Sequence, residues 1–406
     1  MTLLIKRSKT ITKTQFKPIT TPMSTTVAIT DNTSVDNKVL VVDLAQPEAA
    51  SEATATAVNT PIDYKALVAD LAQAVAADDA SKSSMPTYKL ASGYEMPVIA
   101  YGTFRASANE SYEAVLKAIH EGYRHFDLAH IYGNEKEIGK AFAVAFEEGL
   151  VERSDLFVTG KLWNSDHDVD VVPKACQHSL DNLGLDYFDL YLIHFPVCWK
   201  HTGLSTPSWG ESELGSTSLI DTWRAMEALV DAGKVRSIGV SNYPLMLLHD
   251  LVTQARIPVS CNQIETHVYY TRESLVNYCL SRNICVTAHT PLGGGKANEE
   301  WTEAPSPLED PVVRGIAGSK PGATPAKILL RFLLQRGIVV LPKSVKQSRM
   351  KENIELFGPD LVLTDDEMRR LAGLDKYVSY KTNPNPVTAF LGGPDAFSPE
   401  GTDIFD

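Results

Sequence analysis

The chain has 406 residues, enough for one large α/β domain with extensions or for two ordinary domains. Hydrophobic residues make up 44% and charged residues 22%, which is typical of soluble globular proteins, and no apolar run is long enough to predict a membrane-spanning helix. The formal net charge of −12 argues against a general nucleic-acid binder, so an anionic ligand would need a local basic patch.

Cysteine usage bears on the cellular compartment. The five cysteines are odd in number, lie within predicted helices, strands and one loop, and form no CxxC motif. Free thiols in a reducing compartment fit this pattern best, and the cytoplasm is therefore the predicted location. We also predict no metal site.

The first 85 residues differ from the rest of the chain. Residues 1–30 carry lysine, arginine, threonine and serine but no acidic residue, which is typical both of a transit peptide and of a disordered basic tail. The segment then turns acidic and rich in alanine and threonine; Tyr64–Ala77 has helical spacing, and Asp78–Ser84 is typical of a linker. We therefore expect a disordered, low-complexity extension over residues 1–85. Targeting to a plastid or mitochondrion is the alternative to the cytoplasm.

Strands and helices alternate from this boundary onward. Tyr88–Leu90 and Tyr94–Met96 flank a turn containing Gly93 and predict a β-hairpin. Eight strands are then predicted at Val98–Gly102, His125–Leu128, Leu156–Lys161, Leu190–His194, Ser237–Ser241, Ser260–Glu265, Cys285–His289 and Val339–Pro342. Helices are predicted at Ser111–His120, Asn134–Glu148, Val171–Leu183, Leu219–Ala232, Pro244–Gln254, Glu273–Arg282, Pro325–Arg336 and Arg349–Phe357. A last helix begins with a capping box of Thr364 and Glu367.

This alternation predicts the fold class. Eight strand–helix units over residues 86–380 match the size of a (β/α)8 barrel, the TIM barrel, preceded here by the hairpin. A doubly wound open sheet is the alternative, but such a sheet usually carries a GxGxxG motif after its first strand, and that motif is absent here. Residues 381–406 form a C-terminal tail.

Polar residues follow the predicted strands. In a barrel, the residues after each strand converge on one mouth. There the sequence places an acid, a phenol, an amine and an imidazole, namely Asp127, Tyr132, Lys161 and His194. A single buried polar group is often structural, but desolvating charged groups is costly unless they pair, so four titratable groups at one mouth predict a site.

The four groups suit the reduction of a carbonyl. A tyrosine hydroxyl has an ordinary pKa of about 10, too high for an efficient acid at neutral pH. A nearby ammonium lowers such a pKa, so we expect Lys161 to lower the pKa of Tyr132 while an ion pair with Asp127 holds Lys161. His194 is expected to orient the substrate carbonyl. These residues can supply the proton that carbonyl reduction needs, but not the hydride. A hydride donor is therefore implied, and a nicotinamide cofactor is the common one.

Six segments resemble those of the aldo-keto reductases. They are HFDLAHIYGNE (125–135), VTGKLW (158–163), LYLIHFP (190–196), RSIGVSNY (236–243), NQIETH (262–267) and LPKSVKQSRMKEN (341–353). The resemblance covers about Thr87 to Lys376. It implies a barrel that binds NADPH in extended form without a Rossmann fold, with Asp127, Tyr132, Lys161 and His194 as the catalytic residues.

The resemblance also implies the residues that bind the cofactor. Those matching the loop after the first strand are Gly102, Thr103 and Phe104. Those at the nicotinamide are Ser241, Asn242 and Gln263. Those at the adenosine 2′-phosphate and ribose are Lys343, Ser344, Arg349, Glu352 and Asn353. Further cofactor-binding residues are His289, Thr290, Leu292 and Val345. Independently, Lys343, Lys346, Arg349 and Lys351 form a basic cluster in an acidic chain, and arginine binds phosphate in a bidentate way.

One departure from the family pattern narrows the resemblance. His289 stands where the family usually has a tyrosine that stacks on the nicotinamide. The run AHTPLGGGKANEEW (288–301) resembles the plant aldose-6-phosphate and mannose-6-phosphate reductases, which share that histidine, and IHFPVCWKHTG (193–203) resembles the same group. Fungal xylose reductases are the next match. We therefore expect reduction of an aldose 6-phosphate, with Lys200 and His201 binding the substrate.

Two other interpretations of the function are compatible with the sequence. One is a reductase of free sugars such as xylose, and another is a non-catalytic NADPH-binding regulatory subunit like the potassium-channel β subunits. The intact catalytic set favours an enzyme whose partner is a small sugar or sugar phosphate, with neither nucleic acid nor membrane involved, acting as a monomer or homodimer. In the family the C-terminal tail closes the substrate pocket, and a loosely packed tail is the alternative for residues 381–406.

Overall fold

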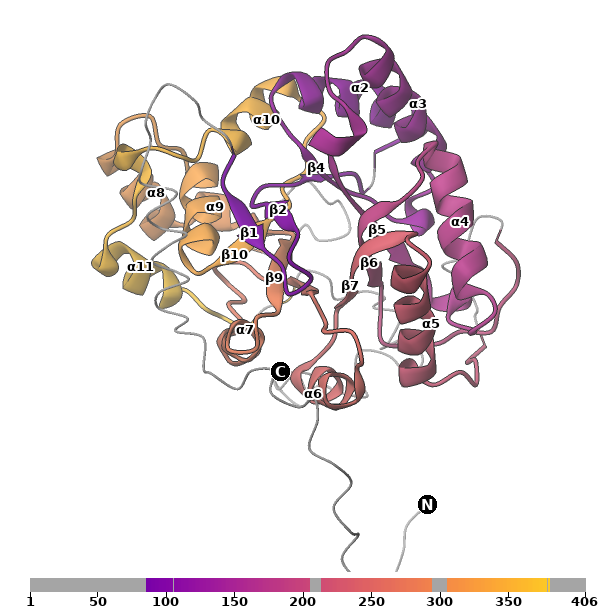
Figure 1. Ribbon diagram of the computed structural model, residues 1–406. Helices are drawn as coiled ribbons and strands as arrows, with labels where there is room; N and C mark the ends of the chain where they lie inside the picture. The colour runs from indigo at the N-terminus through magenta and orange to yellow at the C-terminus, as the bar shows by residue number, and fades with distance from the viewer. Residues whose placement is uncertain (1–84, 105, 205–212, 294–304, 378, 380–406) are drawn as a thin grey trace, which may run out of the picture. The chain divides into compact units, whose positions relative to one another are not determined.

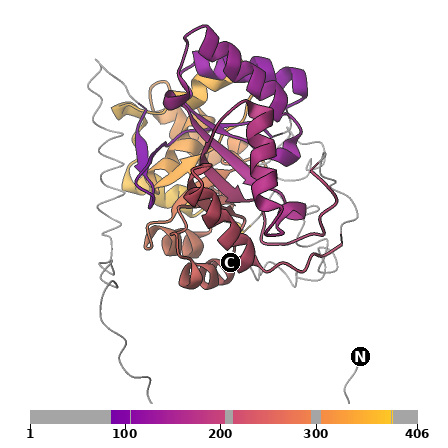
Figure 2. The same cartoon turned by 45° about the vertical axis from the view of Figure 1, so that its right-hand side comes forward.

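The structure is a computed structural model, and it describes residues 85–104, 106–204, 213–293, 305–377 and 379. Figure 1 shows strands at the centre of this part of the chain with helices around them, and Figure 2 shows the same arrangement turned by 45°. The extension predicted for residues 1–85, apart from Met85, and the tail predicted for residues 381–406 lie outside the described residues. Within those residues, no helix is both long and apolar enough to cross a membrane.

Eight parallel strands form the central sheet, in the order β10-β9-β8-β7-β6-β5-β4-β3. Their bounds are β3 (Tyr101–Gly102), β4 (His125–Asp127), β5 (Phe157–Leu162), β6 (Phe188–Ile193), β7 (Val235–Ser241), β8 (Cys261–Glu265), β9 (Cys285–His289) and β10 (Ile338–Val340). A parallel bridge between Ile99 and Val340 joins the residues before β3 to β10. The first and last strands therefore meet, and the predicted (β/α)8 barrel is confirmed.

The helices follow the strands as the alternation predicts. Their bounds are α2 (Ala108–His120), α3 (Glu135–Glu147), α4 (Val172–Leu183), α5 (Leu219–Asp231), α6 (Leu245–Gln254), α7 (Glu273–Leu280), α8 (Pro311–Ser319), α9 (Pro325–Gln335), α10 (Gln347–Ile354) and α11 (Asp365–Ala372). The capping box of Thr364 and Glu367 is present at the start of α11. The sequence prediction lacked α8, a short helix that begins with the N-cap Asp310 and Pro311.

The strands are buried because helices cover the outer face of the sheet and side chains fill its interior. Every residue of β5 and β6 is buried, as expected for parallel strands, which have no solvent-facing side. Both strands are apolar over most of their length, and the charged exceptions are Asp189 near the start of β6, which pairs with Arg153 and Arg236, and Lys161 near the carboxyl end of β5. A cation at this depth requires a partner, which lies on the neighbouring strand β4.

The predicted hairpin covers the amino-terminal end of the barrel. Its strands β1 (Thr87–Lys89) and β2 (Glu95–Pro97) are antiparallel. Its turn reaches β7, where the hydroxyls of Ser92 and Ser237 lie 2.7 Å apart and the guanidinium of Arg236 lies 5.3 Å from the ring of Tyr94. The hairpin thus occupies the end of the barrel opposite the carboxyl ends of the strands, and the predicted site lies at the other end.

Candidate active site

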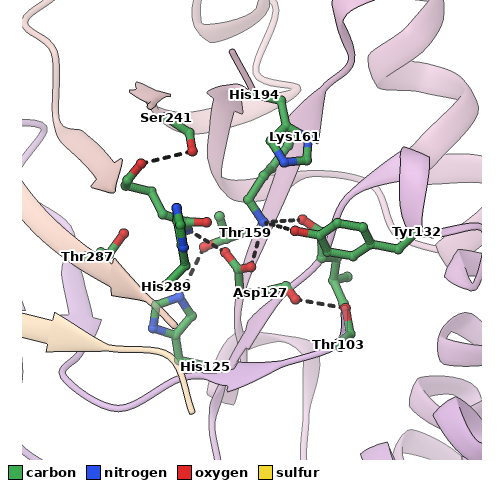
Figure 3. Close-up of polar contacts among 12 residues, drawn as sticks. Thr103, His125, Asp127, Tyr132, Thr159, Lys161, His194, Ser241, Thr287 and His289 are labelled. Carbon is green, nitrogen blue, oxygen red and sulfur yellow. Dashed lines mark hydrogen bonds and ion pairs between the residues drawn. The ribbon is translucent and has the colours of Figure 1, made fainter. Parts of the chain in front are cut away.

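A buried ion pair joins the carboxyl ends of β4 and β5. The Lys161 ammonium donates to Asp127 Oδ1 at 2.5 Å and to the Leu128 carbonyl oxygen at 2.8 Å, and the lysine side chain is 0% exposed. The other oxygen of Asp127 accepts from Gln263 Nε2 at 2.7 Å. Figure 3 shows the contact between Lys161 and Asp127 at the centre of the group. Both charges are therefore paired and hydrogen-bonded, the condition under which a buried ion pair is tolerated.

Tyr132 lies above this pair, on the short 3-10 turn η1 (His130–Tyr132) that follows β4. The Lys161 ammonium lies 3.4 Å from the Tyr132 hydroxyl and donates toward it (Figure 3). The ring of Phe104, which is 43% exposed, packs against the Tyr132 ring with centroids 5.0 Å apart. The structure thus brings together the phenol, the amine and the acid that the sequence predicted.

The predicted lowering of the Tyr132 pKa is wrong. Burial, with the nearby Asp127 charge as a second cause, raises the pKa of Tyr132 well above 10. Burial also lowers the pKa of Lys161, although Asp127 opposes this. In the free protein, burial and the charge of Asp127 together outweigh any lowering of the Tyr132 pKa by the Lys161 ammonium. Burial thus favours the neutral, protonated form of Tyr132.

His194 completes the predicted catalytic set from the end of β6. Its buried ring lies edge-on to Tyr132, with ring centroids 5.9 Å apart, and edge-on to Trp163, with centroids 5.2 Å apart. The side-chain amide of Asn242 donates to the His194 carbonyl oxygen at 2.8 Å. The structure therefore holds the imidazole beside the phenol.

The residues predicted to hold the nicotinamide line the ends of β7, β8 and β9. Ser241 Oγ donates to the Gln263 carbonyl oxygen at 2.9 Å, and His289 Nε2 lies 3.2 Å from Asn242 Oδ1. Asn242 and Thr290 have positive φ angles of 60° and 55°. That conformation is unfavourable for threonine, and such strain is concentrated at ligand-binding sites. The strained Thr290 beside buried polar groups fits the close approach of a cofactor.

A second group of predicted cofactor residues surrounds the start of α10. The Tyr101 hydroxyl donates to the Ser344 carbonyl oxygen at 2.7 Å, and Ser344 Oγ accepts from the Lys346 backbone N–H at 3.1 Å. Arg349 is exposed and has no carboxylate partner among the described residues. Glu352 accepts a hydrogen bond of 2.5 Å from Thr324, the N-cap of α9. Exposed cations at a helix amino terminus fit a phosphate group.

The remaining predicted contacts lie in the loops around the mouth. Thr103 Oγ1 donates to the Asp127 carbonyl oxygen at 2.9 Å, which ties the loop after β3 to β4. Gly102 lies beside the end of β10, where a Cβ atom would stand 3.4 Å from the Leu341 carbonyl oxygen. Leu292 and Val345 are partly buried against the core, and Asn353 is buried. The run at residues 288–301 is described only as far as Gly293.

The two predicted substrate residues lie on a ribbon formed by the chain after β6. An antiparallel bridge between Trp199 and Leu214 joins the two arms of this ribbon, which we call the β6 ribbon (residues 197–204 and 213–217). Lys200 Nζ pairs with Glu213 at 2.9 Å across the ribbon, and both side chains are exposed. His201 Nδ1 lies 3.0 Å from the Ser165 carbonyl oxygen and 3.3 Å from Asp166 Oδ1. Both residues therefore already have protein partners, which the sequence did not predict.

An apolar cluster beside the catalytic residues was not among the predicted site residues. Trp163, Phe195 and Trp199 are buried together with Ala129 and Ile131, and Tyr132 packs against them. The Trp163 and Trp199 rings meet edge to face with centroids 5.5 Å apart. The sequence could have indicated this cluster, because Trp163 and Phe195 closely follow two of the predicted strands, where site residues are expected. This cluster gives the mouth an apolar wall next to the proton donor.

Known proteins resemble this chain in sequence and in fold. Residues 98–376 match the Aldo/keto reductase family. The chain is 44% identical over 308 residues to an NADP-dependent D-sorbitol-6-phosphate dehydrogenase of Malus domestica, covering 74% of this chain and 96% of that protein. It is 43% identical over 321 residues to a probable NAD(P)H-dependent D-xylose reductase of Emericella nidulans, covering 76% of this chain and 100% of that protein.

A solved structure agrees with the sequence matches. The aldose reductase of Schistosoma japonicum superposes with a TM-score of 0.66 at 40% identity, covering 74% of this chain and 95% of that one. Family, fold and class of enzyme agree with the sequence-based predictions. The chain is an oxidoreductase and belongs to the aldo/keto reductase family.

Proposed function

We propose that the protein is an NADPH-dependent reductase that converts the aldehyde of an aldose 6-phosphate to the alditol phosphate. The observation that carries the reductase part is the joining of Asp127, Lys161, Tyr132 and His194 at one mouth. The sugar-phosphate part is supported by the relative that acts on D-sorbitol 6-phosphate, whose dehydrogenation is the reverse of this reaction. Reduction of free sugars is the second candidate, supported by the D-xylose reductase relatives.

The cofactor residues of this chain fit NADPH. Ser241, Asn242 and Gln263 would hold the nicotinamide end, where the backbone is strained and the polar groups are buried. Lys343, Ser344 and Arg349 would hold the 2′-phosphate at the start of α10, where the helix amino terminus also favours an anion. When bound, NADPH supplies the hydride that reduces the carbonyl carbon.

The protein residues supply the proton and the orientation. His194 donates a hydrogen bond to the substrate carbonyl oxygen and places it near the Tyr132 hydroxyl. Tyr132 gives its proton to that oxygen as negative charge develops on it, which forms the alcohol. The phenolate left behind is stabilised by Lys161, 3.4 Å away, and Asp127 keeps the ammonium in place. A proton from solvent then restores the phenol.

We propose that Lys200 binds the phosphate of the substrate. Its partner Glu213 does not prevent this, because an exposed ion pair is weak and a phosphate is a stronger acceptor. Lys200→Met is expected to weaken the use of glucose 6-phosphate by about tenfold or more in kcat/KM, because one charge-assisted contact is lost. The use of D-xylose, which has no phosphate, should barely change. Steady-state kinetics with both sugars measures this difference.

Two further variants make the Lys200 test specific. Glu213→Gln removes the competing carboxylate and should maintain or improve the use of glucose 6-phosphate. Lys117→Met removes a lysine of α2 that is also exposed and paired with a glutamate, and it should have no effect on either sugar. If Lys200→Met lowers the use of both sugars equally, the lysine supports the ribbon and does not bind phosphate.

We also propose that residues 1–85 are dispensable for catalysis, because the family match and the catalytic residues all lie beyond them. A protein that starts near Ser84 is expected to keep kcat and KM within about twofold, since a low-complexity segment offers little to bury. Kinetics on the purified truncated protein checks this. A truncated protein that folds by circular dichroism but reduces no substrate would contradict it. Location in the cytoplasm and the oligomeric state stay predictions.

A further inference from the structure

Both ring nitrogens of His130 face acceptors. Nδ1 lies 3.1 Å from Glu135 Oε2, and Nε2 lies 3.2 Å from the Leu204 carbonyl oxygen. The same glutamate oxygen accepts from Asn182 Nδ2 at 3.2 Å, so it acts as an acceptor here. A neutral imidazole has one donor nitrogen and one acceptor nitrogen, whereas an imidazolium has two donors. Only the protonated ring donates to both partners, so the geometry favours a charged His130.

These contacts connect three segments around the mouth. His130 lies in the η1 turn, two residues before Tyr132, and Glu135 begins α3 directly after that turn. Leu204 lies in the β6 ribbon, 74 residues further along the chain. The ribbon is also attached to the loop after β5, through the Trp199 N–H to the Asn164 carbonyl at 2.8 Å and through His201. His130 is therefore a hydrogen-bonded link between the turn carrying the proton donor and the ribbon carrying the proposed phosphate residue, beside the apolar packing of Ile131 and Tyr132 with Trp199.

Charged and titratable groups surround His130 from each neighbouring element. Glu135 faces it from α3 and Asp166 from the loop after β5, with His201 of the β6 ribbon beside Asp166. The His178 ring of α4 meets it edge-on, with centroids 5.2 Å apart. Burial raises the pKa of Tyr191 and of Cys176, which lie near Glu135, so both stay uncharged. Two carboxylates are thus the anions that face the ring.

This setting fixes the direction of the pH effect. Burial opposes the charged ring, but the hydrogen bond and charge of Glu135, with Asp166 and the Leu204 carbonyl, raise the pKa of His130 above its ordinary 6.5. Because the His130 pKa is higher in the folded protein than in the unfolded chain, the charged ring stabilises the fold fully at pH values below the unfolded pKa. This stabilisation is lost as the pH rises through the pKa of the folded protein.

We infer that His130 is a positioning residue that, as an imidazolium, holds the β6 ribbon to the turn bearing Tyr132, and that deprotonation releases the ribbon. The neutral ring keeps one donor, and that donor stays on Glu135, because a carboxylate is a stronger acceptor than a carbonyl. The other nitrogen then presents a lone pair to the Leu204 carbonyl, and this contact becomes repulsive. The ribbon then loosens, while the turn bearing Tyr132 keeps the contact between His130 and Glu135. KM for the sugar should therefore rise with pH while kcat changes less.

The test compares pH profiles of the unmodified enzyme and of His130→Gln, using the full chain, NADPH and either D-xylose or glucose 6-phosphate. A glutamine amide nitrogen cannot bridge both acceptors. The unmodified enzyme should show a rise in sugar KM of roughly three- to tenfold between pH 6 and pH 9, as expected for one lost hydrogen bond. His130→Gln should show the raised KM at every pH, with NADPH affinity unchanged by fluorescence titration. If KM for the sugar still rises with pH in His130→Gln, the inference is overturned.

Control variants separate His130 from other groups that titrate. His249→Gln changes an exposed histidine that bonds to the Tyr278 hydroxyl, and it should keep the profile of the unmodified enzyme. Burial lowers the pKa of Lys161, so a profile caused by Lys161 would persist in His130→Gln. The experiment uses both sugars. If the enzyme does not use glucose 6-phosphate, the pH dependence of KM for D-xylose still tests the role of His130.

A second variant keeps the inference testable if His130→Gln does not fold. Glu135→Gln removes the carboxylate that faces His130, so the rise in KM should move to lower pH. Proton NMR of the histidine ring in the unmodified enzyme should give one resonance that titrates above pH 6.5 and shifts downward in Glu135→Gln. An unmoved KM profile, or a His130 resonance titrating at or below 6.5, overturns the inference.

Discussion

A Tyr132→Phe variant is expected to reduce aldehydes about 10²- to 10⁴-fold more slowly than the unmodified enzyme, because general acid catalysis contributes on this order. The substitution removes only the hydroxyl. The ring keeps its contact with Phe104, and the ion pair of Lys161 with Asp127 keeps its other hydrogen bonds. The loss should therefore appear in kcat, measured by NADPH oxidation with saturating D-xylose or glucose 6-phosphate.

The binding of NADPH provides the control for this variant. Tyr132 is not among the residues proposed to hold the cofactor, so the dissociation constant should stay within about twofold, as expected when no binding contact is lost. Fluorescence titration with NADPH measures it. Turnover within a few-fold of the unmodified enzyme would show that another group donates the proton.

Arg349→Ala is expected to weaken NADPH binding by roughly 10- to 100-fold, because a charge-assisted contact to the 2′-phosphate is lost. NADH lacks this phosphate, so its dissociation constant should change little. The exposed position of Arg349 on α10, without a carboxylate partner among the described residues, leaves its guanidinium available for a ligand. Titrating both cofactors against the same variant gives the selectivity directly.

A matched arginine elsewhere tests whether charge alone explains the result. Arg369 of α11 is exposed and pairs with Asp366 three residues earlier. Arg369→Ala removes the same charge from another surface and should leave the affinities for both cofactors unchanged. Equal losses of NADPH and NADH in Arg349→Ala would place that residue outside the 2′-phosphate site.

The barrel was predictable from the sequence because its strands are short apolar runs that end in polar residues. Asp127, Lys161 and His194 could be placed at one mouth from the alternation alone, since parallel strands end on the same side. Helix boundaries were predicted less accurately, since α10 begins at Gln347, two residues before the predicted start at Arg349. The short helix α8, which lies between β9 and α9, was missed.

Contacts between distant loops could not be predicted. The pKa of Tyr132 depends on how deeply the hydroxyl is buried and on how close it lies to the charge of Asp127, and neither follows from strand order. The pairing of Lys200 with Glu213 depends on the ribbon folding back on itself. The bridge from His130 to Leu204 likewise spans two loops. Strand-end residues follow from the fold, but loop contacts follow from packing that the sequence pattern does not encode.

The most direct test of the central claim is a substrate panel with the purified enzyme and NADPH. The panel compares glucose 6-phosphate and mannose 6-phosphate with D-glucose and D-xylose, under identical conditions, by the rate of NADPH oxidation. We predict that kcat/KM for at least one hexose 6-phosphate exceeds that for both free sugars. A higher kcat/KM for D-xylose than for either sugar phosphate would contradict the proposal and assign the enzyme to the reduction of free aldoses.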